Sequence, residues 1–218
     1  QEPVRRSGQA DVVSLDDDWR FIRYGLQADG TRVEEPAGMF ETGVDDSGWE
    51  KLDVPHDFAI TGPFRMDLSG NGWYQKTFTV DKADQGKRFY VDFDGVMAYA
   101  KVWLNGEYVG TWPYGYNSFR LDLTPFIKVG EPNVLAVRTD TEKWESRWYP
   151  GAGIYLHVWL VKTGQVHVKH WGTKMEAENL TARTADLHFM VEVENHLDEA
   201  AKAVVKTSVY ELDSLDCL

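Results

Sequence analysis

The chain has 218 residues, of which 43% are hydrophobic and 27% are charged, proportions typical of a globular protein. Its formal net charge is −12 and it contains no cluster of Lys and Arg. We therefore expect no nucleic acid partner, because nucleic acid is itself a polyanion. No stretch approaches the roughly 20 apolar residues that cross a bilayer, so we also expect no membrane span.

Cysteine usage and the first residues bear on where the protein works. The single cysteine, Cys217, excludes an intrachain disulfide and leaves the redox compartment open. The sequence opens with the polar QEPVRRSGQ rather than with Met, which favours a mature chain from which a signal peptide has been removed. We therefore expect a periplasmic or secreted location, with the cytoplasm as the alternative.

The first sixty residues predict short strands between irregular segments. Residues 1–14 have the character of an extended arm, and LDDDWRFIRYG is an aromatic strand after an acidic lead-in. Residues 25–48 are rich in Gly, Glu and Asp without periodicity, which predicts a long surface loop. DDSGWEKLDVPHDFAI then predicts a short strand that runs into Pro55 and a second loop.

Strand patterns dominate from residue 72 to residue 163. GWYQKTFTV and KRFYVDFDGV alternate between two faces, and YAKVWLNGEYVGTW predicts a hairpin around Asn105-Gly106, a preferred type I′ pair. Three further strand-like runs follow, SFRLDLTPFI, EPNVLAVRTD and GIYLHVWLVKT. Many short strands with Gly and Pro turns, and no long amphipathic helix, predict an all-β sandwich or jelly roll.

The pattern changes near Thr163-Gly164. Aromatic residues become fewer, and three more uniform runs follow, QVHVKHWG, ADLHFMVEVENH and KAVVKTSVYELD, as in an immunoglobulin-like sheet. Such a sandwich needs about seven strands, and about three fit before Leu218. We therefore expect a jelly-roll β-sandwich at 1–163, followed at 164–218 by the incomplete N-terminal part of an immunoglobulin-like β-sandwich.

The sequence carries no self-contained catalytic motif. It has no G-x-S-x-G elbow, no phosphate-binding loop and no H-E-x-x-H. His167 and His170 lie three apart, which in a strand points them to opposite faces. We therefore expect no metal site there and assign no metal ligand in the chain. Asp and Glu number 35, too many for a catalytic pair of carboxylates to be singled out.

Two loops, VPHDFAI and SRWYPGAGIY, carry an unusual set of polar and aromatic residues. Both have an ordinary structural interpretation, an Asx-type turn in the first and core-filling aromatics beside a paired arginine in the second. The functional interpretation is a patch for a polyol, in which a carboxylate accepts hydrogen bonds from sugar hydroxyls, a guanidinium donates others and an aromatic ring covers the C–H face. The residues concerned are His56, Asp57, Arg147, Trp148 and Tyr149.

Seven stretches come in the order of one known family across roughly residues 14 to 163. They are LDDDWRF, WEKLDVPHDFAI, GWYQKTFTV, RFYVDFDGVMAYAKVWLNGEYVG, GYNSFRLDLTPFI, NVLAVRTD and RWYPGAGIYLHVWL. In them the chain resembles the N-terminal part of a family-two glycoside hydrolase, the group of β-galactosidases, β-glucuronidases and β-mannosidases. VHVKHWGT and the residues after it resemble the start of that family's immunoglobulin-like second domain.

The resemblance implies a sugar-binding jelly roll packed against a TIM barrel further along the full-length chain. That barrel would carry both catalytic glutamates of a retaining mechanism, about 5 Å apart. No alternation of strands and helices is present in these 218 residues, so we expect no catalytic residue in this chain.

The resemblance also implies roles for the two loops at the rim of the active site. Asp57 matches a position that helps to hold the terminal sugar, and Arg147 matches the other contributing loop, where some members have an acidic residue. His56, Trp148 and Tyr149 are their neighbours on the same rim. In one departure, Leu156 stands where the family usually has Arg after GIY.

The implied function is that of a non-catalytic N-terminal region of an exo-acting retaining glycosidase, with β-galactosidase first. VPHDFAI and RWYPGAGIY look more like that branch than like the glucuronidases. The alternatives are a β-glucuronidase or β-mannosidase of the same family, a stand-alone carbohydrate-binding module and a purely structural domain. The expected partners are a β-galactoside or related glycan and the barrel. We expect no cofactor in this region. The sequence leaves open whether the full-length enzyme binds a metal ion and whether it forms a homo-oligomer.

Overall fold

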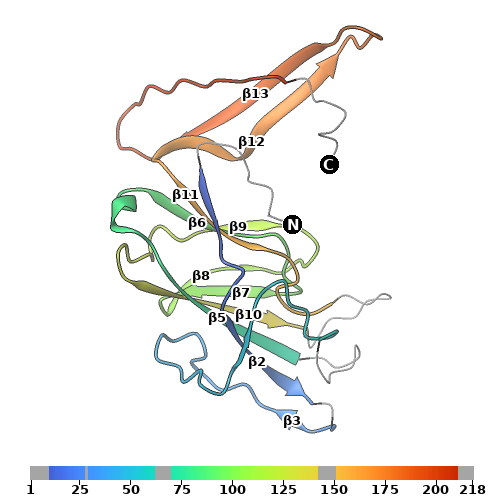
Figure 1. Ribbon diagram of the computed structural model, residues 1–218, viewed down its shortest axis with the longest axis vertical. Helices are drawn as coiled ribbons and strands as arrows, with labels where there is room; N and C mark the ends of the chain where they lie inside the picture. Colours follow the sequence, from blue (N-terminus) through green and yellow to red (C-terminus); the bar gives the residue numbers. More distant parts are fainter. Residues whose placement is uncertain (1–9, 28, 62–69, 142–150, 211–218) are drawn as a thin grey trace. The chain divides into compact units, whose positions relative to one another are not determined.

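The computed structural model of the chain describes residues 10–27, 29–61, 70–141 and 151–210, and these are almost entirely strands, turns and loops (Figure 1). The chain divides into two compact units, residues 1–163 and residues 164–218. Within the described residues the regular helix is a single 3₁₀ turn, η1 (Lys82–Asp84), which confirms the all-β prediction. None of the helical structure described is long and apolar enough to span a membrane.

The smaller sheet of the first unit has four antiparallel strands. In spatial order they are β1 (Asp11–Ser14), β11 (Val158–Thr163), β6 (Arg88–Phe93) and β9 (Phe119–Asp122). The last residues of the expected extended arm are therefore a paired strand, which the sequence analysis did not assign. They form a strand because β11 offers them a free edge, with Val12 paired to Val161.

The larger sheet holds seven strands, with two long strands at its centre. In spatial order they are β3 (Arg32–Val33), β2 (Trp19–Leu26), β5 (Gly70–Thr79), β10 (Pro132–Asp140), β7 (Ala100–Leu104) and β8 (Glu107–Trp112), and β4 (Glu50–Leu52) pairs separately with β2. The predicted β7–β8 hairpin is present. Asn105 and Gly106 both have positive φ, at 54° and 85°, as a type I′ turn requires.

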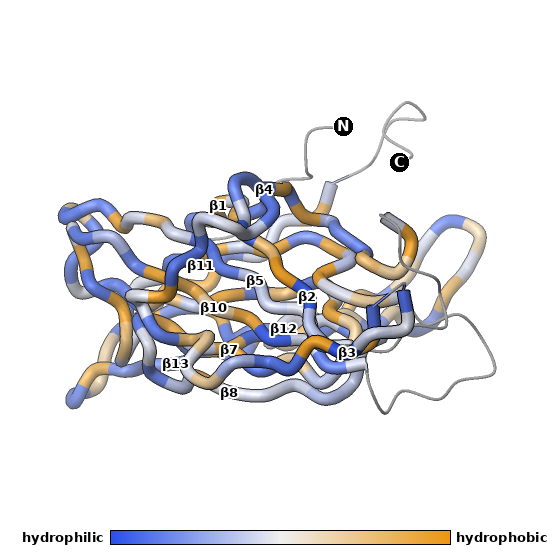
Figure 2. Tube along the Cα trace, turned by 90° about the horizontal axis from the view of Figure 1, so that it is seen from below, coloured by the Kyte–Doolittle hydropathy of each residue, from blue (hydrophilic) through white to orange (hydrophobic). Residues whose placement is uncertain are grey.

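The two sheets pack face to face around one apolar core. Successive side chains of a strand point to opposite faces, so each strand contributes alternate residues to that core. Figure 2 shows hydrophobic and hydrophilic residues interspersed along the strands in this way. The core takes fully buried side chains from both sheets, among them Trp19, Tyr74, Phe93, Leu135 and Val158.

The segment between β2 and β4 covers the outer face of the larger sheet. Residues 25–48 were expected to form a surface loop, and they do contain mostly turns, but Met39 within them and Trp49 just after them are only 5% and 7% exposed. They pack with Tyr24 and Trp73 in a second apolar cluster. The composition of the segment did not predict this packing, because a few apolar side chains are enough to anchor a loop that is otherwise polar.

Glu35 fixes the same segment to the sheet by polar contacts. Its carboxylate accepts two hydrogen bonds of 2.8 Å from Nε and Nη2 of Arg138, and others from Nε1 of Trp73 at 2.8 Å and Nδ2 of Asn71 at 2.7 Å. Burial acts to raise the pKa of Glu35, but the hydrogen bonds from Arg138 and Trp73 outweigh it and leave the pKa below its ordinary value.

The second unit contains one long antiparallel hairpin, β12 (Val166–Glu178) and β13 (Asp186–Asn195). The first two runs predicted after residue 164 are thus strands. The third run spans residues 202–213, and its described part, residues 202–210, forms no strand. Alternation alone does not make a strand, since the backbone N–H and C=O groups also need a neighbouring strand to pair with.

Candidate functional site

The loop that follows β4 is organised by the carboxylate of Asp57. Its Oδ1 accepts a hydrogen bond of 3.0 Å from the backbone N–H of Ala59, two residues on, which is an Asx turn. The backbone carbonyl of Asp57 also accepts from the N–H and the hydroxyl of Thr61, at 2.9 and 2.8 Å. The structural interpretation of this loop is therefore correct, and Asp57 lies in it half-buried.

A second loop, residues 151–157, lies directly against the first. The N–H of His56 donates to the carbonyl of Ile154 at 2.7 Å, and that of Phe58 donates to the carbonyl of Ala152 at 2.9 Å. The N–H of Ala152 donates in turn to Oδ1 of Asp57 at 3.0 Å. Two segments almost a hundred residues apart in sequence are thus joined by hydrogen bonds, with Asp57 as a shared acceptor.

A buried tyrosine lies beneath His56. The Tyr74 hydroxyl is 2.9 Å from Nδ1 of His56, and the ring of Phe21 contacts the imidazole edge-on at 4.8 Å between centroids. Burial lowers the pKa of His56 below its ordinary value, although the nearby carboxylates of Glu50 and Asp57 act to raise it. The imidazole is therefore neutral at neutral pH.

The buried Tyr74 hydroxyl has a second partner besides His56. Burial raises the pKa of Tyr74 well above its ordinary value, so the phenol keeps its proton, and its oxygen accepts from the backbone N–H of Ile154. The phenol proton is then available for Nδ1 of His56. If Tyr74 donates to Nδ1, the imidazole proton lies on Nε2; the 2.9 Å separation equally allows Nδ1–H to donate to the Tyr74 oxygen.

Two glycines allow the loops to approach so closely. Gly151 and Gly153 have φ values of +75° and +113°, in the left-handed region that favours glycine. A Cβ at Gly153 would lie 2.8 Å from the carbonyl oxygen of His56 and would also collide with Oη of Tyr74, and a Cβ at Gly151 would lie 2.8 Å from Oδ2 of Asp57. The glycines after Pro150 are therefore required by packing as well as by the turn.

Of the five rim candidates, the structure describes two. His56 and Asp57 lie side by side in the first loop, with the geometry given above, and the structure leaves their role toward a sugar untested. Arg147, Trp148 and Tyr149 lie outside the described residues.

Tyr155 of the second loop connects it to two exposed tyrosines, and the sequence analysis singled out none of the three. Oη of Tyr155 donates to the carbonyl of Gly115 at 2.7 Å. On either side of Gly115, Tyr114 and Tyr116 are 54% and 50% exposed and meet edge-to-face at 5.7 Å between centroids. Exposed aromatic rings suit the C–H faces of sugars. The run WPYGYNSF carried this signal, but nothing in the sequence connected it to the other two loops.

Comparison with known proteins points to one family. The family model for "Glycosyl hydrolases family 2, sugar binding domain" matches residues 13–163. The β-galactosidase BoGH2A of Bacteroides ovatus is 42% identical over 207 residues, which are 90% of this chain and 23% of that protein.

Solved structures give the same picture. A glycosyl hydrolase family 2 member from Bacteroides cellulosilyticus superposes with a TM-score of 0.75 at 35% identity, over 85% of this chain and 25% of that one. A β-glucuronidase from glycoside hydrolase family 2 superposes with a TM-score of 0.78 at 26% identity, over 90% of this chain and 23% of that one. The chain spans about a quarter of the length of each of these proteins.

Proposed function

Because the chain belongs to glycosyl hydrolase family 2, we propose that it forms the sugar-binding region of an exo-acting retaining glycosidase that removes terminal β-D-galactosyl groups. In this proposal the two loops joined at Asp57 form part of the rim of an active site. The rest of that site, including the catalytic carboxylates, would come from a barrel domain of the full-length enzyme.

The observation that carries the proposal is the junction of the two loops. Hydrogen bonds from the backbone to the half-buried carboxylate of Asp57 hold both loops in place. Their polar groups are therefore already fixed, and the loops lose little conformational entropy when a sugar binds. Both backbone N–H groups donate to Oδ1 of Asp57, and sugar hydroxyls are donors from which a carboxylate can accept. In this proposal the carboxylate of Asp57 accepts a hydrogen bond from a sugar hydroxyl, with the imidazole of His56 next to it in the same loop.

The substrate preference rests on the relative named β-galactosidase, at 42% identity over 90% of this chain. A β-glucuronide is the second candidate. One solved structure with the same fold is named a β-glucuronidase. Arg147, in the stretch SRWYPGAGIY, would suit a uronic acid, because a guanidinium pairs with a carboxylate through two hydrogen bonds.

The experiment that tests the proposal compares substrates on the full-length enzyme. We expect kcat/KM for an aryl β-D-galactoside to exceed that for the matching β-D-glucuronide by at least about tenfold, a difference of about 1.4 kcal/mol in transition-state binding. Lowering of the glucuronide rate by Arg147→Ala, with the galactoside rate unchanged, would favour the second candidate. Hydrolysis of neither substrate, nor of a β-mannoside, would contradict the proposal.

A further inference from the structure

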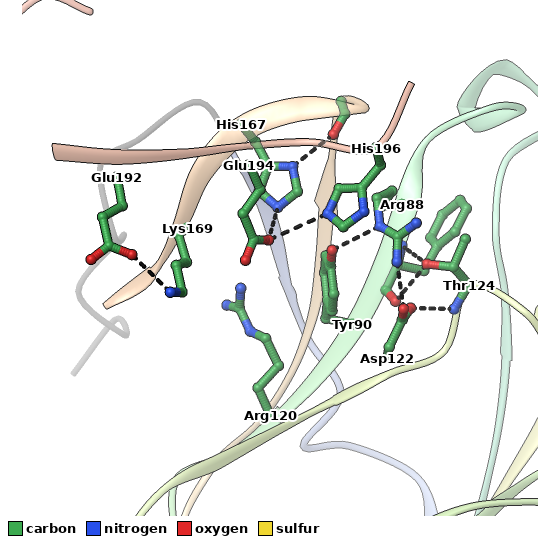
Figure 3. Close-up of polar contacts among 12 residues, drawn as sticks. Arg88, Tyr90, Arg120, Asp122, Thr124, His167, Lys169, Glu192, Glu194 and His196 are labelled. Carbon is green, nitrogen blue, oxygen red and sulfur yellow. Dashed lines mark hydrogen bonds and ion pairs between the residues drawn. The ribbon is translucent and has the colours of Figure 1, made fainter. Parts of the chain in front are cut away.

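Three side chains at the open end of the β12–β13 hairpin point toward one another: His167, Glu194 and His196 (Figure 3). His167 lies on β12 directly opposite Glu194 on β13. His196 follows Glu194 by two residues, which places both side chains on the same face of the strand. The backbone N–H of His196 donates to the carbonyl of Gln165 at 3.0 Å, so its position is fixed although it lies just beyond β13.

Two of the distances among the ligand atoms are close to those around a metal ion. Nε2 of His167 and Nε2 of His196 lie 3.6 and 3.3 Å from the same carboxylate oxygen, Oε2 of Glu194. All three ligand atoms lie within 4.8 Å of one another. Two ligand atoms bound to a tetrahedral zinc ion at about 2.0–2.1 Å are about 3.3 Å apart.

The tautomer of His167 also favours a cation. Its Nδ1 lies 3.0 Å from the carbonyl oxygen of Gly164, which can only accept, so Nδ1 carries the proton. In the neutral imidazole Nε2 then presents a lone pair toward Glu194, and two acceptors repel each other unless a proton or a metal ion lies between them. A metal-binding histidine usually donates its other N–H to such a carbonyl, which fixes the ring.

We propose that His167, Glu194 and His196 bind a first-row transition-metal dication, Zn²⁺ above all, at the open end of the second unit's hairpin. Two imidazole nitrogens with one carboxylate select zinc and its neighbours over Ca²⁺ and Mg²⁺, which prefer oxygen ligands. Three protein ligands leave one position of a tetrahedron for water. The ion would clamp β12 to β13 at the residues where the hairpin begins and ends. This site is independent of the function proposed for the first unit.

The hairpin contains a matched control. Nε2 of His188 lies 3.6 Å from Oε2 of Glu178, the same separation as in the His167–Glu194 pair. Among the described residues, that pair has no third His, Cys, Asp or Glu close enough to share an ion. Removing His188 therefore tests whether an isolated histidine–glutamate pair on this hairpin binds metal.

The test is a zinc titration of the chelator-treated chain by isothermal calorimetry, in a Cys217→Ser background so that the single thiol does not contribute. We expect one ion per chain with a dissociation constant of about 10 µM or tighter. His196→Ala and Glu194→Gln should each weaken binding at least tenfold, and His188→Ala should leave it unchanged. His196 is partly exposed, so its variant should fold, as circular dichroism would check.

Cobalt gives a second measurement that does not depend on affinity alone. Co²⁺ in a four-coordinate site of nitrogen and oxygen ligands absorbs visible light strongly, and we expect this band in the parent chain and in His188→Ala but not in His196→Ala. Three results would overturn the proposal. The first is no binding at a zinc concentration about ten times the expected dissociation constant. The others are a loss of zinc affinity in His188→Ala equal to that in His196→Ala, or unchanged zinc affinity in His196→Ala.

Discussion

Replacing Asp57 separates its part in the loop junction from its proposed part in sugar binding. In Asp57→Ala, the N–H groups of Ala59 and Ala152 both lose their acceptor. These residues are 7% and 3% exposed, so water does not easily replace the carboxylate. In Asp57→Asn, the amide oxygen can still accept both hydrogen bonds, and the change removes the charge and one acceptor oxygen.

The two variants should therefore differ in stability. A buried N–H left without an acceptor costs about 1–3 kcal/mol, so Asp57→Ala should lower the free energy of unfolding by about 2–4 kcal/mol. For a unit of this size that loss corresponds to a fall in Tm of about 5–15 °C. Asp57→Asn should lose less than about 1 kcal/mol, because its hydrogen bonds are weakened rather than removed.

Activity gives the other half of the comparison. If Asp57 accepts from a substrate hydroxyl, both variants should lower kcat/KM of the full-length enzyme at least about tenfold, which is about 1.4 kcal/mol. Thermal denaturation of the 218-residue chain and steady-state kinetics of the full-length enzyme measure the two effects. Asp45→Ala is the matched control, because exposed Asp45 accepts the same Asx hydrogen bond, from the N–H of Ser47 at 3.0 Å, and is not among the residues whose hydrogen bonds join the two loops. An Asp57→Asn enzyme with unchanged kcat/KM would refute the sugar contact and leave Asp57 a turn residue.

Three further predictions concern the loop junction and the contact of Glu35 with the larger sheet. Gly153→Ala should lower Tm by at least about 5 °C, because the new methyl group would lie 2.8 Å from the carbonyl oxygen of His56. Gly43 has open space around it, so Gly43→Ala should not lower Tm in this way. An equal fall in Tm in the two variants would contradict this reasoning. The depressed pKa of Glu35, held by Arg138 against the opposing effect of burial, contributes stability that is present above the unfolded pKa and is lost as pH falls through the folded value. In Glu35→Gln the free energy of unfolding should therefore fall less steeply with decreasing pH. Denaturant titrations at several values between about pH 6 and pH 3 measure this dependence, and a slope equal to that of the parent chain would count against the contact. Nuclear magnetic resonance titration should find the pKa of His56 below 6.5, since burial disfavours its charged form, and a value above 6.5 would be inconsistent with the buried imidazole.

The strands could be predicted from local patterns because alternation is a local property. The aromatic run before Gly25, the Asn105-Gly106 turn and the run 132–140 each identify themselves within ten residues or so. The same patterns misjudged residues 202–210 and did not reveal that residues 11–14 pair with another strand. Whether an extended segment becomes a strand depends on a partner elsewhere in the chain, as β1 has in β11.

The sequence by itself determined the β-sandwich, the family and the two loops that carry unusual residues, since each of these can be recognised from contiguous residues. Only the tertiary structure decided which of those residues meet. It joined Asp57 to Ala152 across 95 positions, and it gathered His167 with Glu194 and His196, whereas the sequence had compared His167 only with His170. Antiparallel register brings together residues with no fixed spacing along the chain, and for that reason a site shared between strands has no local signature.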